Sequence, residues 1–589
     1  MKLSSKWHIE LLRKLHKVNI DPDTLFFALT LLVGVGSAAV AIFIFEAIEH
    51  LSELFKTHER PTTLSLVFGS LFILCSGYIT TRLSPDSAGS GIPQTKIALV
   101  AHHGTIKFRD WFLKLIASIL ALSSGVTLGR EGPTVAVTSG LGSSIGRLFG
   151  LNKTSVKSLV AVGSAGGIAA AFNTPIAAVT FTLEEIVGNL NAKALGPIVI
   201  SSVAAAVTAK VFYGGETMFS GIKYIFEDPS ELIFYLALGL LAGGLGPVWV
   251  KTILFLRDRS IKFFKGHKLS IIMCTFFLIY LSAYFFPHTL GSGHHLIHDA
   301  LLSKFQDWEF IVKLFLVKFL FTSLCYSAGI SGGLFMPTLF LGAMIGTLTG
   351  LAAQEIYPLA NPAGAFALVG MGAFFAAVIR APFTSILIIF ELTQDYKIIL
   401  PLMIANITAF MFSKRLMSGS VYEQISEQDG IHLPTKDDFD TLEKLTVEEA
   451  MVTDVKTLHA NLTVKEAMNL VNHSEISGYP VLGEGKLVGV ISTNQIGKAC
   501  AEYKGQCLIS DVCTKNLIVI YPDQSLMVAF HLLNRHKISR LMVTSRLNDQ
   551  TLLGIITAED IVNRFGFHIQ EESKADVIDQ HLEKMEKSG

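Results

Sequence analysis

Residues 1–430 of the chain contain long apolar runs without a single charged side chain. Crossing the hydrocarbon core of a membrane takes about 20 consecutive apolar residues. Because such runs recur over most of the chain, the pattern favours a polytopic membrane protein over a large soluble helical protein. The charge-free runs are Leu25–Phe45, Pro61–Thr81, Ser158–Leu183, Phe319–Gln354 and Tyr357–Ile379.

Glycine and proline interrupt the apolar pattern at two places, Gly129–Pro133 and Gly332–Pro337. Backbone that is not helical at membrane depth is tolerated only inside protein or beside a water-filled cavity. Broken helices at corresponding places in two halves of a transporter indicate a central binding site. The two interruptions therefore predict such a site.

The two halves of the apolar region resemble each other. We interpret them as an internal duplication of about Leu25–Tyr213 and Glu231–Ser413, and the sequence leaves open whether the copies are parallel or inverted. Matched residues recur at one constant spacing, which pairs Gly163, Pro175 and Glu184 with Gly370, Pro382 and Glu391, and Pro133 recurs as Pro337 at nearly the same spacing.

The composition changes after about residue 430. Charged residues are nearly twice as frequent from Ile431 to Gly589 as in the residues before. This region holds a second, smaller duplication. Each copy reads as a helix, a short strand, a strand ending in glycine, and a Ser or Thr that opens another helix. We expect a soluble α/β module here.

This module resembles a tandem pair of CBS domains, a family that commonly binds adenosine nucleotides. The second copy ends GIITAED and the first ends GVISTNQ. The resemblance implies that Thr557 and Asp560 contact the ribose of ATP, ADP or AMP. Gln495 stands where the first copy would need the aspartate, so one such clamp at most is expected. The alternative is a rigid dimerisation module without a ligand.

Charge and cysteine content exclude several classes of protein. The chain has 48 basic and 48 acidic residues, and a balance of zero gives no surplus for binding nucleic acid. Half of the residues are hydrophobic, which excludes a disordered chain. The six cysteines form no CxxC or metal spacing, which favours a reducing compartment for the C-terminal module.

The N-terminus carries a basic stretch from Lys2 to Lys17. The apolar run after it is of spanning length and lacks an A-x-A site, so we expect no cleaved signal peptide. A basic start predicts an N-terminus in the cytoplasm. The size of the chain favours a bacterial protein, hence a multi-pass protein of the bacterial inner membrane.

Three loops carry the candidate chemistry, and they read GSGIP (89–93), GREGP (129–133) and GGLFMP (332–337). Each places Pro near the start of a helix. Helix N-termini attract anions through free N–H groups and the helix dipole. One such turn usually has only the structural role of starting a helix, but three of them predict helix N-termini that converge on an anion. A site without a full positive charge suits a transported anion, because binding must allow release.

In this order, the three loops resemble the signature loops of the CLC family of chloride channels and chloride/proton exchangers. The resemblance covers about residues 25–425, and CBS pairs are frequently appended in this family. It implies an α-helical polytopic membrane protein with an inverted-repeat fold of about eighteen helices, followed by a cytoplasmic α/β CBS pair. It also implies a homodimer in membrane lipid, with one pore per subunit.

The resemblance further implies a chloride site. Ser90 matches the serine whose hydroxyl contacts the central anion, and serine at this place favours chloride over nitrate. Leu334 and Phe335 match the residues whose backbone amides hold that anion. Tyr422, by its position after the last apolar run, matches the tyrosine whose phenol closes the inner side. The alternative for Tyr422 is an interfacial anchor.

Two glutamates are candidates for proton transfer. Glu131 lies at a helix start within an apolar region, where ionisable residues are functional by default, although a carboxylate that satisfies the helix dipole is the plainer interpretation. The resemblance implies that Glu131 gates the anion path and takes up external protons. It implies that Glu185 accepts internal protons. The alternative for Glu184 and Glu185 is a pair of carboxylates facing water.

Three other features stay outside this scheme. Lys114 is either a side chain that snorkels to the surface or a positive charge near the ion path. Arg130 is interpreted as structural, with an added positive potential. The histidines show no metal spacing, and His102, His103, His294 and His295 are expected in loops.

The sequence thus predicts a chloride/proton antiporter and no enzyme, with nucleotide regulation through the CBS pair. A passive chloride channel gated by voltage or pH is the first alternative, and family channels typically have an apolar residue at the position of Glu185. A fluoride/proton exchanger is the second, against which Ser90 and Tyr422 weigh. We expect no required cofactor and no metal, because the Cys and His residues show no metal spacing. An intramembrane metalloprotease would need H-E-x-x-H, which is absent.

The expected organisation of the chain has six parts. They are a cytoplasmic N-terminal segment at 1–24, a transmembrane domain at 25–425, a linker at 426–445, CBS domains at 446–500 and 508–567, and a charged tail at 568–589.

Overall fold

The computed structural model of the chain describes residues 21–53, 62–188, 192–214, 228–358, 360–431, 441–471, 476–502 and 506–565. The chain divides into two compact units, Met1–Leu433 and Pro434–Gly589. The expected tail at 568–589 lies outside the described residues, and so does the expected N-terminal segment apart from residues 21–24.

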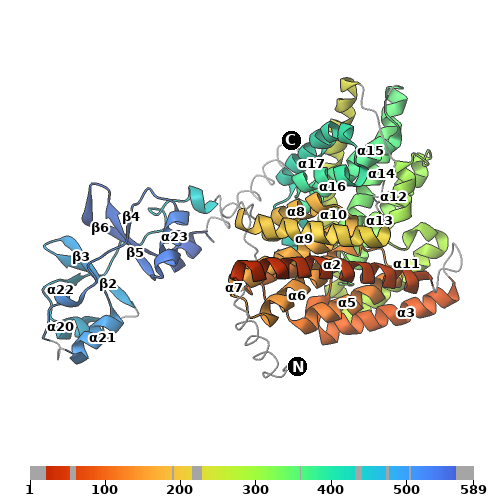
Figure 1. Ribbon diagram of the computed structural model, residues 1–589. Coiled ribbons are helices and arrows are strands. Elements are labelled where there is room, and N and C mark those ends of the chain that lie inside the picture. The colour runs from red at the N-terminus through yellow and green to blue at the C-terminus, as the bar shows by residue number, and fades with distance from the viewer. Residues whose placement is uncertain are drawn as a thin grey trace. The chain divides into compact units, whose positions relative to one another are not determined.

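The first unit is a bundle of helices, coloured from red to teal in Figure 1. Its described residues form two successive sets of eight α-helices, and the short helix α18 (Val421–Gln428) follows them. The first set is α2 (Pro22–Glu53), α3 (Thr63–Tyr78), α4 (Ile92–Val100), α5 (Phe108–Ser123), α6 (Glu131–Leu148), α7 (Lys153–Phe172), α8 (Pro175–Phe181) and α9 (Ala192–Tyr213). The second set is α10 (Leu232–Phe263), α11 (Lys268–Phe285), α12 (His294–Leu301), α13 (Trp308–Ser327), α14 (Phe335–Ile356), α15 (Ala363–Ile379), α16 (Pro382–Thr393) and α17 (Ile399–Leu416).

The surface of this unit is apolar where lipid would contact it. Among the residues described, nine helices are long and apolar enough to cross a membrane. The most apolar windows of α7 and α14 are 83% and 78% buried, whereas that of α9 is 33% buried. Large side chains on outer helices, such as Val211 and Phe285, are exposed. Extensive outward-facing apolar surface belongs in a membrane, so this unit is an integral membrane domain with α7 and α14 in its interior.

Two carboxylates show how the halves are related. Glu184 lies in the π-helical segment η3 (Thr182–Val187), which continues α8, and accepts hydrogen bonds from the backbone N–H (3.0 Å) and hydroxyl (2.8 Å) of Thr384 in α16. Glu391 near the end of α16 accepts one from the N–H of Ala177 in α8 (2.7 Å). The end of each helix lies at the start of the other, so α8 and α16 run antiparallel. The two repeats are therefore inverted.

Glycines let the helices behind the loops approach closely. A Cβ atom on Gly142 of α6 would lie 2.1 Å from the carbonyl oxygen of Leu159 in α7. In the second half, a Cβ on Gly346 of α14 would lie 2.1 Å from the carbonyl oxygen of Phe366 in α15. Small residues at helix interfaces in membranes allow such backbone contact. The α6–α7 and α14–α15 pairs therefore have matching construction in the two repeats.

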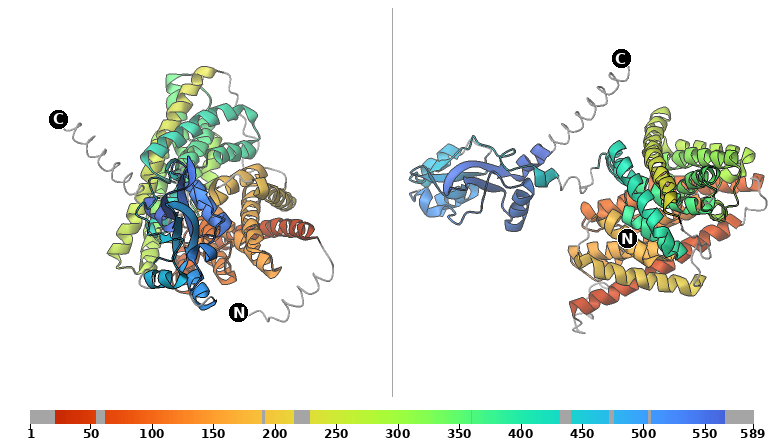
Figure 2. Two further views of the ribbon diagram at one scale, coloured as in Figure 1. Left: turned by 90° about the vertical axis from the view of Figure 1, so that its left-hand side faces the viewer. Right: turned by 90° about the horizontal axis from the view of Figure 1, so that it is seen from above.

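The described residues of the second unit, drawn in blue in Figure 2, form two sheets of one design. In each sheet the first two strands are parallel and the last two antiparallel. The strands are β1 (Leu458–His459), β2 (Gly478–Gly483) and β3 (Lys486–Ser492) in one sheet, and β4 (Val519–Ile520), β5 (Arg540–Ser545) and β6 (Asn548–Thr557) in the other. The helices are α20 (Val464–Val471), α21 (Thr493–Glu502), α22 (Ile509–Val512) and α23 (Leu526–His536).

The two copies of this unit exchange their opening segments. Val452, which precedes the first sheet, pairs with Ile555 in β6, and Thr514 pairs with Val490 in β3. Leu445 and Val447 belong to the hydrophobic core of the second copy. The segment that opens the first copy in the sequence thus packs within the second.

Candidate functional site

Backbone hydrogen bonds join the three glycine-rich loops. The N–H of Gly129 donates to the carbonyl of Gly333 (2.8 Å), and the N–H of Gly333 donates back to the carbonyl of Gly129 (2.7 Å). The N–H of Gly332 donates to the carbonyl of Gly89 (3.1 Å). Loops far apart in the sequence therefore meet at one place.

The glycines at this junction leave no room for side chains. A Cβ on Gly132 would lie 2.3 Å from Ser90 Oγ, and one on Gly333 would lie 2.9 Å from the backbone nitrogen of Gly132. Gly91 has a φ of 92°, a conformation that disfavours other residues. The glycines of the three motifs are thus required by close approach of the backbone and by turn geometry.

Three helices begin at the junction. They are α4, α6 and α14, and their N-cap residues Gly91, Arg130 and Leu334 make no side-chain capping hydrogen bond. The first N–H groups of a helix have no partner within the helix, and with the helix dipole they favour an anion. The expected convergence of uncapped helix N-termini is therefore present.

Polar side chains surround these helix starts. Ser90 Oγ, Glu131 Oε2 and Tyr422 Oη are buried, and none has a hydrogen-bond partner among the described residues. An unpaired buried polar group costs about 1–3 kcal/mol. A bound anion would accept hydrogen bonds from both hydroxyls, so this set of groups fits an anion. Leu334 and Phe335 are also buried here, at the start of α14.

Tyr422 is held inside the unit by the short helix α18. Ser420 and Glu423 form a capping box at its start, in which the N–H of Ser420 donates to Glu423 Oε2 (2.7 Å). Tyr422 in this first turn has 0% exposure. Its hydroxyl lies beside the Ser90 side chain and within electrostatic range of Glu131 and Glu185. Complete burial contradicts the alternative of an interfacial anchor.

Two buried lysines hold loops in matching positions of the repeats. Lys114 Nζ donates to the carbonyls of residues 87–89, the closest being that of Gly89 (2.5 Å). Lys318, its counterpart in the second repeat, donates to the carbonyls of residues 289–291, the closest being that of Gly291 (2.6 Å). Lys114 is 2% exposed, so it does not snorkel to the surface. It fixes the loop that carries Ser90.

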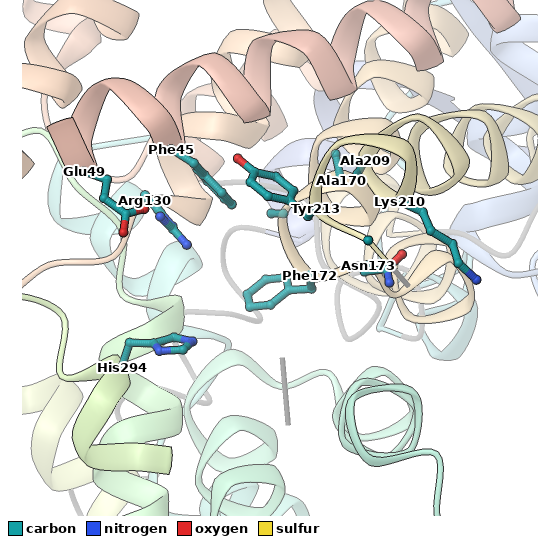
Figure 3. Close-up of a pocket in the computed structure, with 12 residues that line it drawn as sticks. Phe45, Glu49, Arg130, Ala170, Phe172, Asn173, Ala209, Lys210, Tyr213 and His294 are labelled. Carbon is teal, nitrogen blue, oxygen red and sulfur yellow. The ribbon is translucent and has the colours of Figure 1, made fainter. Parts of the chain in front are cut away.

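Arg130 lines a pocket of about 280 Å³ on the far side of its helix start. Its guanidinium lies 3.5 Å from the ring centroid of Phe45, and Figure 3 shows it beside Phe45 and Glu49. Lys210 and His294 also line this pocket. His294 and His295 open helix α12, so the expectation of a loop was wrong for both. The preceding Gly291-Ser292-Gly293 repeats the GSG of the first loop and starts a helix in the same way.

The structure separates the two neighbouring glutamates. Glu184 is engaged in the α8–α16 contact, whereas Glu185 is buried with 4% exposure. Glu185 Oε1 accepts hydrogen bonds from Lys96 Nζ (2.9 Å) and Ser420 Oγ (3.2 Å). Burial of Glu185 contradicts the alternative of two carboxylates facing water.

The sequence analysis missed Lys96, Lys318 and Glu423. Lys96 is the one charged residue in α4, and an ionisable side chain within an apolar helix is a signal that the rule for intramembrane charges would have found. Lys318 could have been found as the counterpart of Lys114 in the second repeat. Glu423 gave no such signal, because α18 is polar.

The candidate nucleotide-binding residues of the second unit cap the start of a helix. Asp560 Oδ2 accepts hydrogen bonds from the N–H (2.8 Å) and hydroxyl (2.7 Å) of Thr557. Gln495 makes the same contacts with Ser492 in the first copy, at 2.8 and 3.1 Å. Asp560 and Gln495 thus make equivalent capping contacts in the two copies. In the part of the chain that the structure describes, no group of three or more His, Cys, Asp or Glu side chains could hold a metal ion.

Comparisons with known proteins agree with this geometry. The family model described as "Voltage gated chloride channel" matches residues 72–414, and the CBS domain model matches 447–502 and 509–566. The H(+)/Cl(-) exchange transporter ClcA of Vibrio cholerae is 33% identical over 415 residues, which cover 67% of this chain and 88% of that protein.

Solved structures share the fold. A slow cyanobacterial Cl-/H+ antiporter aligns with a TM-score of 0.63 at 23% identity, over 70% of this chain and 99% of that one. A eukaryotic CLC transporter aligns with a TM-score of 0.64 at 21% identity, over 91% and 97% of the two chains.

Lys114→Met should weaken anion binding, because it removes the ammonium that donates to the carbonyls of residues 87–89 and so loosens the loop of Ser90. We expect the chloride affinity of the purified protein, measured by isothermal titration calorimetry, to fall roughly tenfold or more. Lys318→Met is the matched control, since it removes the same kind of contact from residues 289–291. An equal loss of affinity in both variants, or none in Lys114→Met, would show that Lys114 does not position the site.

Proposed function

The chain belongs to the voltage-gated chloride channel family, and we propose that it exchanges chloride for protons across a membrane as a secondary active transporter. One observation carries the proposal: buried neutral hydroxyls that fit an anion lie close to two buried carboxylates, Glu131 and Glu185. A passive anion path needs only the first of these features, and proton coupling needs both. The name of the ClcA relative supports the same function.

Chloride is held in this proposal by the hydroxyls of Ser90 and Tyr422 and by the backbone N–H groups of Leu334 and Phe335. All four donors are neutral. The helix dipoles of α4, α6 and α14 add favourable potential without a full charge. Such a site binds chloride weakly enough to release it on the other side, as transport requires.

Glu131 serves as the gate and as the external proton group. Its carboxylate lies at the uncapped start of α6, against Gly129 and Met336. When ionised, it competes with chloride for the same positive helix ends. When protonated, it loses that attraction and leaves the anion path open. One side chain thereby links proton uptake to chloride passage, and Arg130 adds positive potential beside it.

Glu185 serves as the internal proton group. It is buried yet held by Lys96 and Ser420, so its charged form has partners. A carboxylate here favours exchange over the alternative of a passive channel gated by voltage or pH. The second alternative, a fluoride/proton exchanger, is disfavoured by the hydroxyls of Ser90 and Tyr422, which match the chloride pattern.

The proposal places the protein as a homodimer with one pore per subunit, surrounded by lipid. We assign it to a bacterial inner membrane, with the N-terminus and the CBS pair in the cytoplasm, because the N-terminal stretch is basic. Transport by this scheme needs no cofactor, and the chain is assigned no enzymatic reaction.

The CBS pair is proposed as a regulatory module that binds ATP, ADP or AMP through the second copy. Asp560 and Thr557 lie at the end of β6, where the family pattern has its ribose contact. To bind a ribose, the Asp560 carboxylate must keep one oxygen on Thr557 and offer the other. Gln495 lacks a carboxylate, so the first copy does not form the same contact.

Proton movement driven by chloride tests the transport proposal. Purified protein in liposomes should move protons uphill when a chloride gradient is imposed. Glu131→Ala should lower proton flux by roughly tenfold or more while chloride still passes, because the coupling carboxylate is gone. Glu185→Gln should slow proton flux to a similar degree and spare chloride. No proton movement in the unmodified protein would establish a channel, and unchanged coupling in either variant would remove that residue from the mechanism.

Nucleotide binding is tested on the full-length protein with radiolabelled ATP. We expect Asp560→Ala to abolish binding and Gln495→Ala to leave it intact, although both remove one helix cap contact of about 1 kcal/mol. Thermal unfolding should report the matched loss of stability in the two variants. Absence of ATP, ADP and AMP binding at millimolar concentration would leave the CBS pair a structural module.

A further inference from the structure

Three ionisable side chains meet inside the membrane unit, away from the glycine loops. Lys96 Nζ lies 2.9 Å from Glu185 Oε1 and 3.1 Å from Glu423 Oε1. The side chains of Lys96, Glu185 and Glu423 are 11%, 4% and 18% exposed. Burying charged groups of this kind costs desolvation free energy, and the ion pair is strongly weakened when one partner loses its charge.

Each member of this cluster belongs to a different element. Lys96 is on α4, which begins just after Ser90, and Glu185 is on η3. Glu423 is on α18, next to Tyr422. The cluster therefore joins the helix of one chloride hydroxyl, the segment of the internal proton group, and the helix of the other hydroxyl.

Ser420 adds a second connection between Glu185 and α18. Its hydroxyl donates to Glu185 Oε1 (3.2 Å) and accepts from the N–H of Glu423 (3.4 Å) as the N-cap of the helix. The first turn of α18 is thus attached to η3 through both Ser420 and the Lys96 bridge. Hydrogen bonds to an ionised acceptor are roughly twice as strong as neutral ones, so both connections depend on the charge of Glu185.

The charges that act on Glu185 come from two of the described elements packed around it. They are Lys96 of α4 and Glu423 of α18, and the phenol of Tyr422 is in range. Helix α8 has no ionisable residue, and α7 carries charge only at Lys153 and Lys157 in its first turns. Changes in the charge of Glu185 therefore act chiefly on α4 and α18.

We propose that Lys96 is a positioning residue that transmits the protonation state of Glu185 to α18 and its Tyr422. With Glu185 ionised, the Lys96 bridge and the Ser420 hydrogen bond hold the first turn of α18 against η3, and Tyr422 stays beside the chloride site. A proton on Glu185 removes the ionic attraction and weakens the Ser420 bond. Helix α18 then remains attached to Lys96 through Glu423 but is released from η3, so that Tyr422 can move aside.

This inference rests on the proposed roles of Glu185 and Tyr422, and it adds a physical link between them. Proton arrival from the inside would open the inner side to chloride, so the two ions would not cross independently. The link is made by the side chains of Lys96, Glu185, Glu423 and Ser420 and not by the backbone of the glycine loops. Substitutions of these side chains therefore test it.

Hydrogen exchange of the α18 peptide tests the link without requiring transport. In the full-length protein, we expect the protection factors of residues 421–428 to fall roughly tenfold or more between about pH 8 and about pH 5. Glu185→Gln, which mimics the protonated form, should give low protection at every pH. Lys96→Met should do the same, and Lys96→Arg should restore the pH dependence. If Lys96→Met does not fold, Lys96→Gln replaces it with the same expected result.

Arg257→Gln is the matched control. Arg257 holds the other end of α18 through Gln428 (3.0 Å) and Asp429 (2.5 Å) and does not contact Glu185. This variant should lower protection at all pH values and keep the pH dependence. The inference is overturned if protection of α18 is independent of pH in the unmodified protein, if Glu185→Gln or Lys96→Met keeps the dependence, or if Arg257→Gln abolishes it. Proton flux measured on the same samples reports on the transport proposal separately.

Discussion

The reciprocal hydrogen bonds between Gly129 and Gly333 are the constraint on which the site depends. They join the two repeats where each helix is interrupted, and the bond from Gly332 to Gly89 adds the third loop. Backbone groups at membrane depth need partners because lipid offers none. By pairing with each other, the loops hold the starts of α4, α6 and α14 together, and none of these helices has a side-chain cap from its N-cap residue. Glycine is required because any side chain would separate the loops.

Charge is used sparingly around this junction, and four of the charged side chains hold parts of the scaffold together. Lys114 and Lys318 bind loop carbonyls in equivalent positions of the two repeats. Glu184 and Glu391 bind helix starts across the interface between the repeats. A net charge of zero is thus compatible with a domain in which helix dipoles face the proposed anion site, while full charges hold the scaffold.

Much of this architecture could be predicted from the sequence. The constant spacing of matched residues reveals the duplication, and the three ordered loops indicate both the family and the place of the site. The matched residues alone left parallel and inverted copies open, and inversion was implied only by the family resemblance, because the direction rests on which helix start Glu184 reaches in space. The ion pair of Lys96 with Glu423 could not be predicted either. The two residues lie near opposite ends of the sequence of the membrane unit, and no local pattern connects them. The exchange of segments between the two CBS copies could not be predicted for the same reason. Leu445 and Val447 directly precede the first copy in the sequence, yet they pack in the core of the second.

The central claim is that neutral groups at the loop junction hold the transported anion. Anomalous diffraction from crystals grown in bromide tests it most directly, because bromide replaces chloride and can be located without ambiguity. The account predicts a bromide peak within hydrogen-bonding distance of Ser90 Oγ and Tyr422 Oη, at the start of α14. A bromide found only in the pocket of Arg130 and Lys210, with none at the loop junction, would contradict it.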